Sequence, residues 1–77
     1  MDNKRRSLLS EAVLMLSNAA VIVERVSDKE QDCVDNYPEN LQGTEKFEHM
    51  EAAIDNLNDA MEKIDEAKEH IQSAIAH

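Results

Sequence analysis

The chain has 77 residues, and its 17 acidic side chains outnumber its 8 lysines and arginines, for a net charge of -9 at pH 7. This surplus of negative charge repels phosphate and excludes nonspecific binding to nucleic acid. The length suits one domain, residues 1–77, with a small core. Chains this short usually need a disulfide, a metal or a partner chain for stability, and a single cysteine, Cys33, rules out an intrachain disulfide.

The composition predicts an all-α fold. Good helix formers are plentiful, and the chain has one glycine and one proline. Both lie between residues 35 and 44, where Pro38 disfavours helix at Tyr37. The chain therefore divides into a first helix at 7–34, a loop at 35–44 and a second helix at 45–75.

The first predicted helix follows a basic segment, which we expect to be a frayed tail. Its apolar seam consists of Leu9, Ala12, Val13, Leu16, Ala19, Ala20, Val23, Val26, Cys33 and Val34. A second stripe of Leu8, Met15 and Ile22 repeats every seven residues. Residues 8–23 are thus apolar almost all round, and a helix of that kind must be surrounded by others.

This apolar run has some features of a signal peptide or a membrane span. Glu11 and Asn18 interrupt it, and no small-residue cleavage site follows. It is also shorter than the ~20 apolar residues that a spanning helix needs. We therefore expect a cytoplasmic protein.

The loop at 35–44 contains the sole tyrosine and several hydrogen-bonding side chains. Loops carry recognition more often than helix faces do. The candidates for partner binding are Asn36, Tyr37, Asn40 and Gln42. In the alternative interpretation, Tyr37 and Leu41 cap the end of the bundle and the polar side chains hold the turn together.

The second predicted helix has the clearest periodicity. Thr44 is its expected N-cap, with Glu45 in the first turn. Its apolar series alternates spacings of three and four, the heptad pattern of a coiled coil: Phe47, Met50, Ile54, Leu57, Met61, Ile64, Ile71 and Ile75. Lys68 interrupts the series. A row of alanines runs beside it at Ala53, Ala60, Ala67 and Ala74.

Two helices of matched length and a short loop predict an antiparallel, coiled-coil-like hairpin. One hairpin covers only one side of the first helix. A homodimer that forms a four-helix bundle covers the rest, and a different protein on that face is the alternative. The predicted oligomer interface consists of Leu8, Leu9, Met15, Leu16, Ile22 and Val23.

Catalytic and metal-binding patterns are weak in this chain. There is no Gly-rich phosphate loop and no supported nucleophile–histidine arrangement. Glu66 and His70 are four residues apart and could share a metal ion, but one carboxylate and one surface histidine make a weak site. The motifs at 48–51 and 62–65 resemble the ExxE and ExxD magnesium ligands of all-α nucleotide pyrophosphohydrolases, but they share one helix instead of facing each other. We expect no enzyme, no metal and no cofactor.

Acidic side chains form a ridge along the second helix, and it is the main candidate for binding a partner. It consists of Glu48, Glu51, Asp55, Asp59, Glu62, Asp65, Glu66 and Glu69. Like charges four residues apart cost a few tenths of a kcal/mol each. The ridge either docks on a basic protein surface or is simply a solvated face.

Residues 34–70 resemble a family of short uncharacterised proteins from Firmicutes, their phages and mobile elements. The likeness rests on Asn36-Tyr37-Pro38-Glu39-Asn40-Leu41-Gln42-Gly43-Thr44, which fits an N-[LY]-P-E-[NS]-L-Q-x-[ST] core, and on the acidic, alanine-rich heptads that follow. The resemblance implies a small bacterial or phage accessory protein and assigns no functional residue.

These observations favour a non-enzymatic, phage-type protein-binding module in the host bacterial cytoplasm. Its expected target is a bacterial defence protein, through an anti-CRISPR or other anti-defence activity, and that target would be a basic protein that handles nucleic acid. The alternatives are a bundle that sequesters a nucleotide messenger and a purely structural or assembly protein. We expect no direct contact with nucleic acid or membrane.

Overall fold

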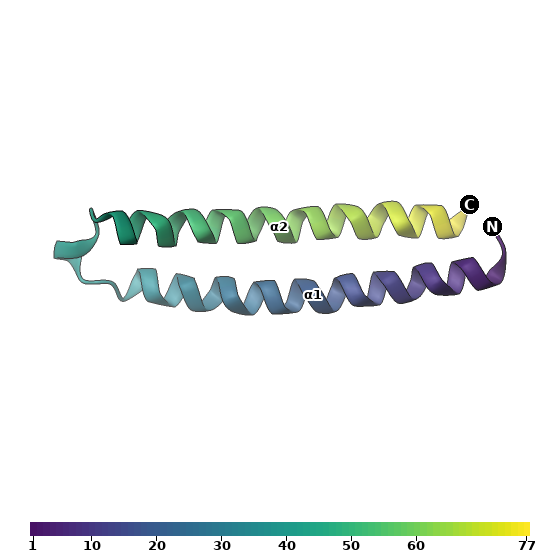
Figure 1. The fold of residues 1–77 in the computed structure, drawn as a ribbon, viewed down its shortest axis with the longest axis horizontal. Helices are drawn as coiled ribbons and strands as arrows, with labels where there is room; N and C mark the ends of the chain where they lie inside the picture. The colour runs from purple at the N-terminus through teal and green to yellow at the C-terminus, as the bar shows by residue number, and fades with distance from the viewer.

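The computed structural model describes residues 1–77 and consists of two long helices joined by a short turn. Helix α1 spans Asn3–Asp35, the 3-10 helix η1 spans Glu39–Leu41, and α2 spans Glu45–Ala76. The two long helices run antiparallel side by side, with both chain termini at the same end (Figure 1). The all-α hairpin predicted from the sequence is confirmed.

Both helices begin at a side-chain cap. The Thr44 hydroxyl accepts a hydrogen bond from the Phe47 N–H at 3.4 Å, which confirms the predicted N-cap of α2. The prediction of a frayed basic tail is wrong, because Asp2 caps α1 in the same way. One Asp2 carboxylate oxygen accepts from the Arg5 N–H at 2.8 Å, and the other lies 3.7 Å from the Arg5 guanidinium. A satisfied N-terminal donor lets the helix start at Asn3.

The helices meet along two heptad seams, all of whose members are buried or half-buried. The seam of α1 consists of Leu9, Val13, Leu16, Ala20, Val23, Ser27, Glu30 and Val34. The seam of α2 consists of Phe47, Met50, Ile54, Leu57, Met61, Ile64, Lys68, Ile71 and Ile75.

The C-terminal half of the α1 seam differs from the sequence prediction. Val26 is 47% exposed and Cys33 is exposed, so neither belongs to the seam. The strict alternation of four and three continues instead through Ser27, which is only 5% exposed. Its hydroxyl donates a hydrogen bond to the side-chain oxygen of Asn58 at 3.3 Å. The helix therefore keeps its heptad register although this places a polar residue in the seam. Bringing Val26 into the seam would require a shift by one residue, and the helix would have to rotate.

One chain alone has very little core. Phe47 and Ile54 are its only buried apolar residues. The molecule is a rod of 60 × 15 × 13 Å with a radius of gyration of 17.5 Å, whereas a compact chain of this length has about 11.5 Å. Its accessible surface is 5822 Å², against the roughly 4,700 Å² expected for a compact protein of the same mass.

Phe47 is the best-anchored apolar residue, because its ring also packs on Tyr37 with centroids 5.4 Å apart. We predict that Phe47→Ala lowers the free energy of unfolding by about 3 kcal/mol, as other buried aromatic truncations do. Urea unfolding followed by circular dichroism at one fixed protein concentration measures this loss. The control, Tyr37→Phe, keeps the ring contact and should change stability by less than about 0.5 kcal/mol. Equal losses in the two variants would contradict this packing.

Candidate functional site: two unlike faces of the hairpin

The hairpin has two different faces, one on each side of the seam. In an antiparallel pair, the residues just before the seam positions of both helices share one side, and the residues just after them share the other. Two surface hollows show this arrangement. Cys33 lines one hollow together with Lys46 and Met50, whereas Gln31 lines the other, together with Glu51 and others.

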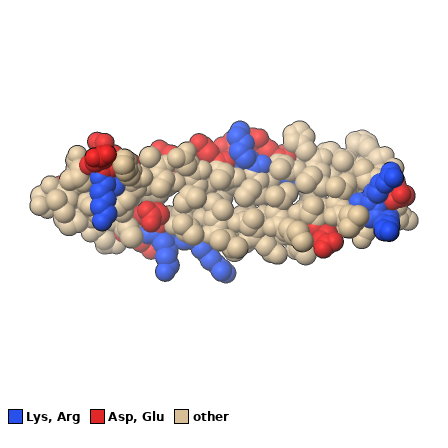
Figure 2. All heavy atoms as spheres, viewed as in Figure 1, with Lys and Arg blue, Asp and Glu red and all other residues tan.

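The face before the seam, here called the apolar face, carries large apolar side chains on α1, and on α2 it alternates alanines with longer polar side chains. Its α1 row consists of Leu8, Ala12, Met15, Ala19, Ile22, Val26, Lys29 and Cys33, and its α2 row of Lys46, His49, Ala53, Asn56, Ala60, Lys63, Ala67, His70 and Ala74. Leu8, Met15 and Ile22 are 57%, 63% and 61% exposed. Figure 2 shows this side of the hairpin, where uncharged atoms cover most of the middle and charged atoms lie mainly at the edges and ends.

The opposite face, here called the acidic face, carries nine carboxylates from both helices. They belong to Glu24, Asp28 and Asp35 of α1 and to Glu48, Glu51, Asp55, Glu62, Asp65 and Glu69 of α2. None of the chain's lysines or arginines occupies these rows. Leu14 and Val21, which are 62% and 46% exposed, continue the face toward the N-terminal half of α1.

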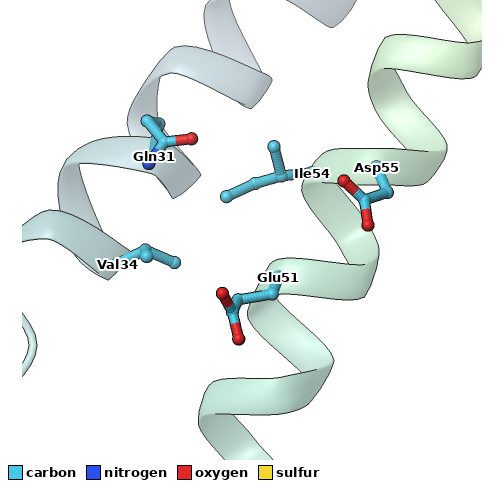
Figure 3. A pocket seen from close by; sticks show the side chains of 5 residues that line it. All are labelled: Gln31, Val34, Glu51, Ile54 and Asp55. Carbon is cyan, nitrogen blue, oxygen red and sulfur yellow. The ribbon is translucent and has the colours of Figure 1, made fainter. Parts of the chain in front are cut away.

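A shallow cavity of about 130 Å³ lies on the acidic face between the helices. Ile54 points across it toward α1, and the carboxylates of Glu51 and Asp55 lie on either side (Figure 3). Gln31 and Val34 line it from α1. Because the lining offers two anionic groups and no cation, this hollow suits a basic side chain better than a phosphate or other anion.

All eight acidic residues singled out from the sequence are exposed. Six of them lie on the acidic face, and Asp59 and Glu66 lie at the outer edge of α2. Glu24, Asp28 and Asp35 were not predicted, because the spacing of acidic residues within the second helix gives no information about the first. They follow the α1 seam positions Val23, Ser27 and Val34 by one residue, and this spacing was the available signal.

Two of the four loop candidates make hydrogen bonds within the turn, whereas Leu41, expected in the alternative interpretation to cap the bundle, is 40% exposed. The Asn36 amide donates to the Asp32 carbonyl at 2.8 Å, and the Gln42 amide donates to the Tyr37 carbonyl at 3.4 Å. Tyr37 is half-buried against Phe47. Asn40 is exposed and makes no hydrogen bond through its side chain, and the Tyr37 hydroxyl makes none either, so these two candidates have free polar groups.

The residues of the predicted oligomer interface fall on two different surfaces. Leu9, Leu16 and Val23 pack in the seam against α2. Leu8, Met15 and Ile22 lie exposed on the apolar face. Only the second set is available to another molecule without opening the hairpin.

The second hollow, of about 460 Å³, lies on the apolar face near the turn and is open to solvent. Cys33, Tyr37 and Met50 line it, with Glu30 and Lys46 at its rim. No group of three or more His, Cys, Asp or Glu side chains is close enough to hold a metal ion. The histidines are exposed, and His49 lies 3.7 Å from Glu45.

Helix α1 also includes an 18-residue stretch with a mean hydropathy of 1.5, none of it buried in the hairpin. By length and composition alone this stretch meets the requirement for crossing a membrane, as do core helices and signal sequences.

No protein-family model, curated protein or solved structure matches this chain.

Repulsion within the acidic face gives a testable prediction. We expect Glu51→Gln with Asp55→Asn to raise stability by a few tenths of a kcal/mol at low salt, because like charges at this spacing destabilise a helix by that amount. The gain should disappear at about 0.5 M NaCl, where screening is strong. Thermal unfolding at both salt concentrations measures it.

The matched control is Glu45→Gln, which removes a carboxylate from the first turn of α2. There the charge interacts favourably with the helix dipole, so its loss should lower stability. A decrease in stability of the Glu51→Gln, Asp55→Asn variant as well would contradict this prediction, because it would show that these carboxylates are stabilised by more than solvent.

Proposed function

We propose that this chain is a non-enzymatic protein-binding module that docks on a basic protein through its acidic face. The observation that supports this function is the concentration of nine carboxylates, without a lysine or arginine, on one side of the hairpin. Complementary charge steers association and selects the partner. The rigid pair of helices fixes the spacing of the charges before binding, which lowers the entropic cost of docking.

The dimensions of the acidic face favour a partner that ordinarily binds nucleic acid. From Glu48 to Glu69 the carboxylates extend along α2 for roughly 32 Å at 1.5 Å per residue. That length is close to the roughly 34 Å of one turn of DNA. A row of negative charge of this length can occupy a groove built for a phosphate backbone. We therefore propose that the module inhibits a bacterial defence protein that handles nucleic acid, as an anti-CRISPR or other anti-defence factor in the bacterial cytoplasm.

Leu14 and Val21 give this docking surface an apolar end. Charged rims mainly set association rates, whereas desolvated apolar anchors contribute much of the affinity. A partner that contacts both parts of the face would bury these two side chains beside its basic patch.

The apolar face supports a second part of the proposal, namely self-association into a homodimer. Exposed Leu8, Met15 and Ile22 lie on the side of α1 away from the acidic face. Dimerisation through them would leave both acidic faces free to bind partners.

A charge-reversal variant tests the docking surface. We expect Glu51→Lys with Asp55→Lys and Glu62→Lys to lose the proteins that the immobilised native chain captures from a bacterial lysate at 50 mM salt. The reason is that three attractive contacts become repulsive. Capture by the native chain should also fall at 500 mM salt, where screening removes steering. Quantitative mass spectrometry measures both losses.

The control variant carries the same change in charge away from the acidic face: Asp32→Lys with Asp59→Lys and Glu66→Lys. It should keep the captured proteins, and these should be enriched in nucleic-acid-binding proteins. Equal capture by the two variants, or a captured set without basic proteins, would contradict the proposed docking surface.

A further inference from the structure

We infer that two copies of this chain stack through their apolar faces, with α1 of each copy lying on α2 of the other and both turns at the same end. This inference rests on the self-association proposed above and specifies its surface, partner and geometry. Three observations support it: the different rows that α1 and α2 contribute to the apolar face, the excess surface of the single chain, and the charges beside these rows.

Helix α1 carries a second heptad seam, one residue before the first. It runs Leu8, Ala12, Met15, Ala19, Ile22, Val26, Lys29 and Cys33, with spacings that alternate four and three. Two seams one residue apart are separated by about 100° around the helix. This is the angle at which a helix meets two neighbours in a four-helix bundle. The first neighbour is α2 of the same chain, and the second seam has no partner within it.

The area available matches a stable dimer of this chain. One chain exposes about 1,100 Å² more than a compact protein of its mass. If each copy covered that excess, the interface would bury roughly 2,200 Å² in total, within the range of permanent homodimers. A membrane surface would need no such match of areas.

The choice of α2 as the partner of α1 follows from side-chain size. Within one chain, Ser27 lies opposite Asn58 and Tyr37 opposite Phe47. A two-fold axis parallel to the helices preserves these levels between copies. Leu8, Met15 and Ile22 then lie within one helical turn of the partner's Ala74, the partner's Ala67 and the partner's Ala60, respectively. With the same offset, Ala12, Ala19 and Val26 lie near the partner's His70, the partner's Lys63 and the partner's Asn56. Along most of the row a small side chain therefore faces a longer one.

The charges beside the rows agree with the same register. Arg25 lies at the level of the partner's Asp59, and Glu11 lies about one helical turn from the partner's His70. The basic residues of the first α1 turn lie near the C-terminus of the partner's α2, where cations are favoured by the helix dipole. An axis across the helices would instead set α1 on the partner's α1 and bring Leu8 to the level of the partner's Glu30.

Paired variants on α1 test which face is used. Met15→Glu with Ile22→Glu places two charges on the apolar face, and should raise the dimer dissociation constant at least ~100-fold because those charges would be buried. Leu14→Glu with Val21→Glu makes the same change on the acidic face. Leu14 and Met15 are 62% and 63% exposed, and Val21 and Ile22 are 46% and 61% exposed, so all four positions are open to solvent in the single chain. Sedimentation equilibrium should find the first variant monomeric at 50 µM, where the second and the native chain are dimers.

A distance measurement tests the arrangement without disturbing either face. Asn40→Cys in a Cys33→Ser background places one nitroxide label at the tip of each turn. Pulsed electron paramagnetic resonance should give a separation below about 30 Å, three interhelical spacings. Hairpins stacked in opposite directions would separate the labels by about 60 Å, the length of the molecule.

The outcomes distinguish this arrangement from the proposals on which it rests. A dimer that the two glutamate variants weaken equally, or a label separation near 60 Å, overturns the arrangement and leaves self-association standing. A native chain that is monomeric at 50 µM overturns both, as does a monomer that floats with phosphatidylglycerol vesicles through Met15 and Ile22. None of these results bears on the acidic face, which the lysine variants test separately.

Discussion

The structure depends on one constraint, which is that the heptad seam of α1 keeps its register against α2 along the whole hairpin. This register places Ser27 and Glu30 in the seam while Val26 and Cys33 remain outside it. A shift by one residue near Val23 would bury those apolar side chains, but α1 would have to unwind locally to make it. The intact helix instead satisfies Ser27 with the Asn58 side chain and leaves the row of Leu8, Met15, Ile22 and Val26 exposed on α1.

That row has energetic consequences because the seam alone buries so little. Two buried apolar residues cannot offset the conformational entropy of ordering 77 residues. We propose that the missing burial comes from a second molecule, because the apolar face is where the chain has apolar area to contribute. The acidic face has the opposite character, since it repels a second copy of itself and attracts basic surfaces. In this proposal, assembly and partner binding use opposite sides of one thin hairpin, so a substitution on one side can disrupt one interaction and leave the other intact.

Much of the fold follows from the sequence, because helical periodicity and turn chemistry are local properties. Pro38 and Gly43 locate the turn, Thr44 caps α2, and the spacing from Phe47 to Ile75 identifies its seam. Two features were missed for physical reasons. Asp2 is a favourable N-cap residue, but an N-cap can be recognised only when the turn that follows it is known to be helical. The shift from Val26 to Ser27 depends on strict register against α2, which outweighed the preference for apolar residues.

The candidate site was only half accessible from the sequence. Carboxylates on α2 share a helix, so their spacing alone predicts an acidic ridge. Glu24, Asp28 and Asp35 join it only through the antiparallel pairing of the two helices, which determines the rows that share a side. The same pairing separates Leu9, Leu16 and Val23, which pack inside the hairpin, from Leu8, Met15 and Ile22, which lie outside it. Helical periodicity predicts which side chains share one side of a helix, and the pairing of the helices determines whether that side is buried or exposed.

The most direct test of this account is thermal unfolding of the native chain by circular dichroism over a dilution series from about 1 to 100 µM. Because the single hairpin has too little core, folding should be coupled to association, and Tm should rise steadily with protein concentration. A Tm that stays constant over the series would show that one chain is stable alone, and would contradict the claim that a second copy completes the core.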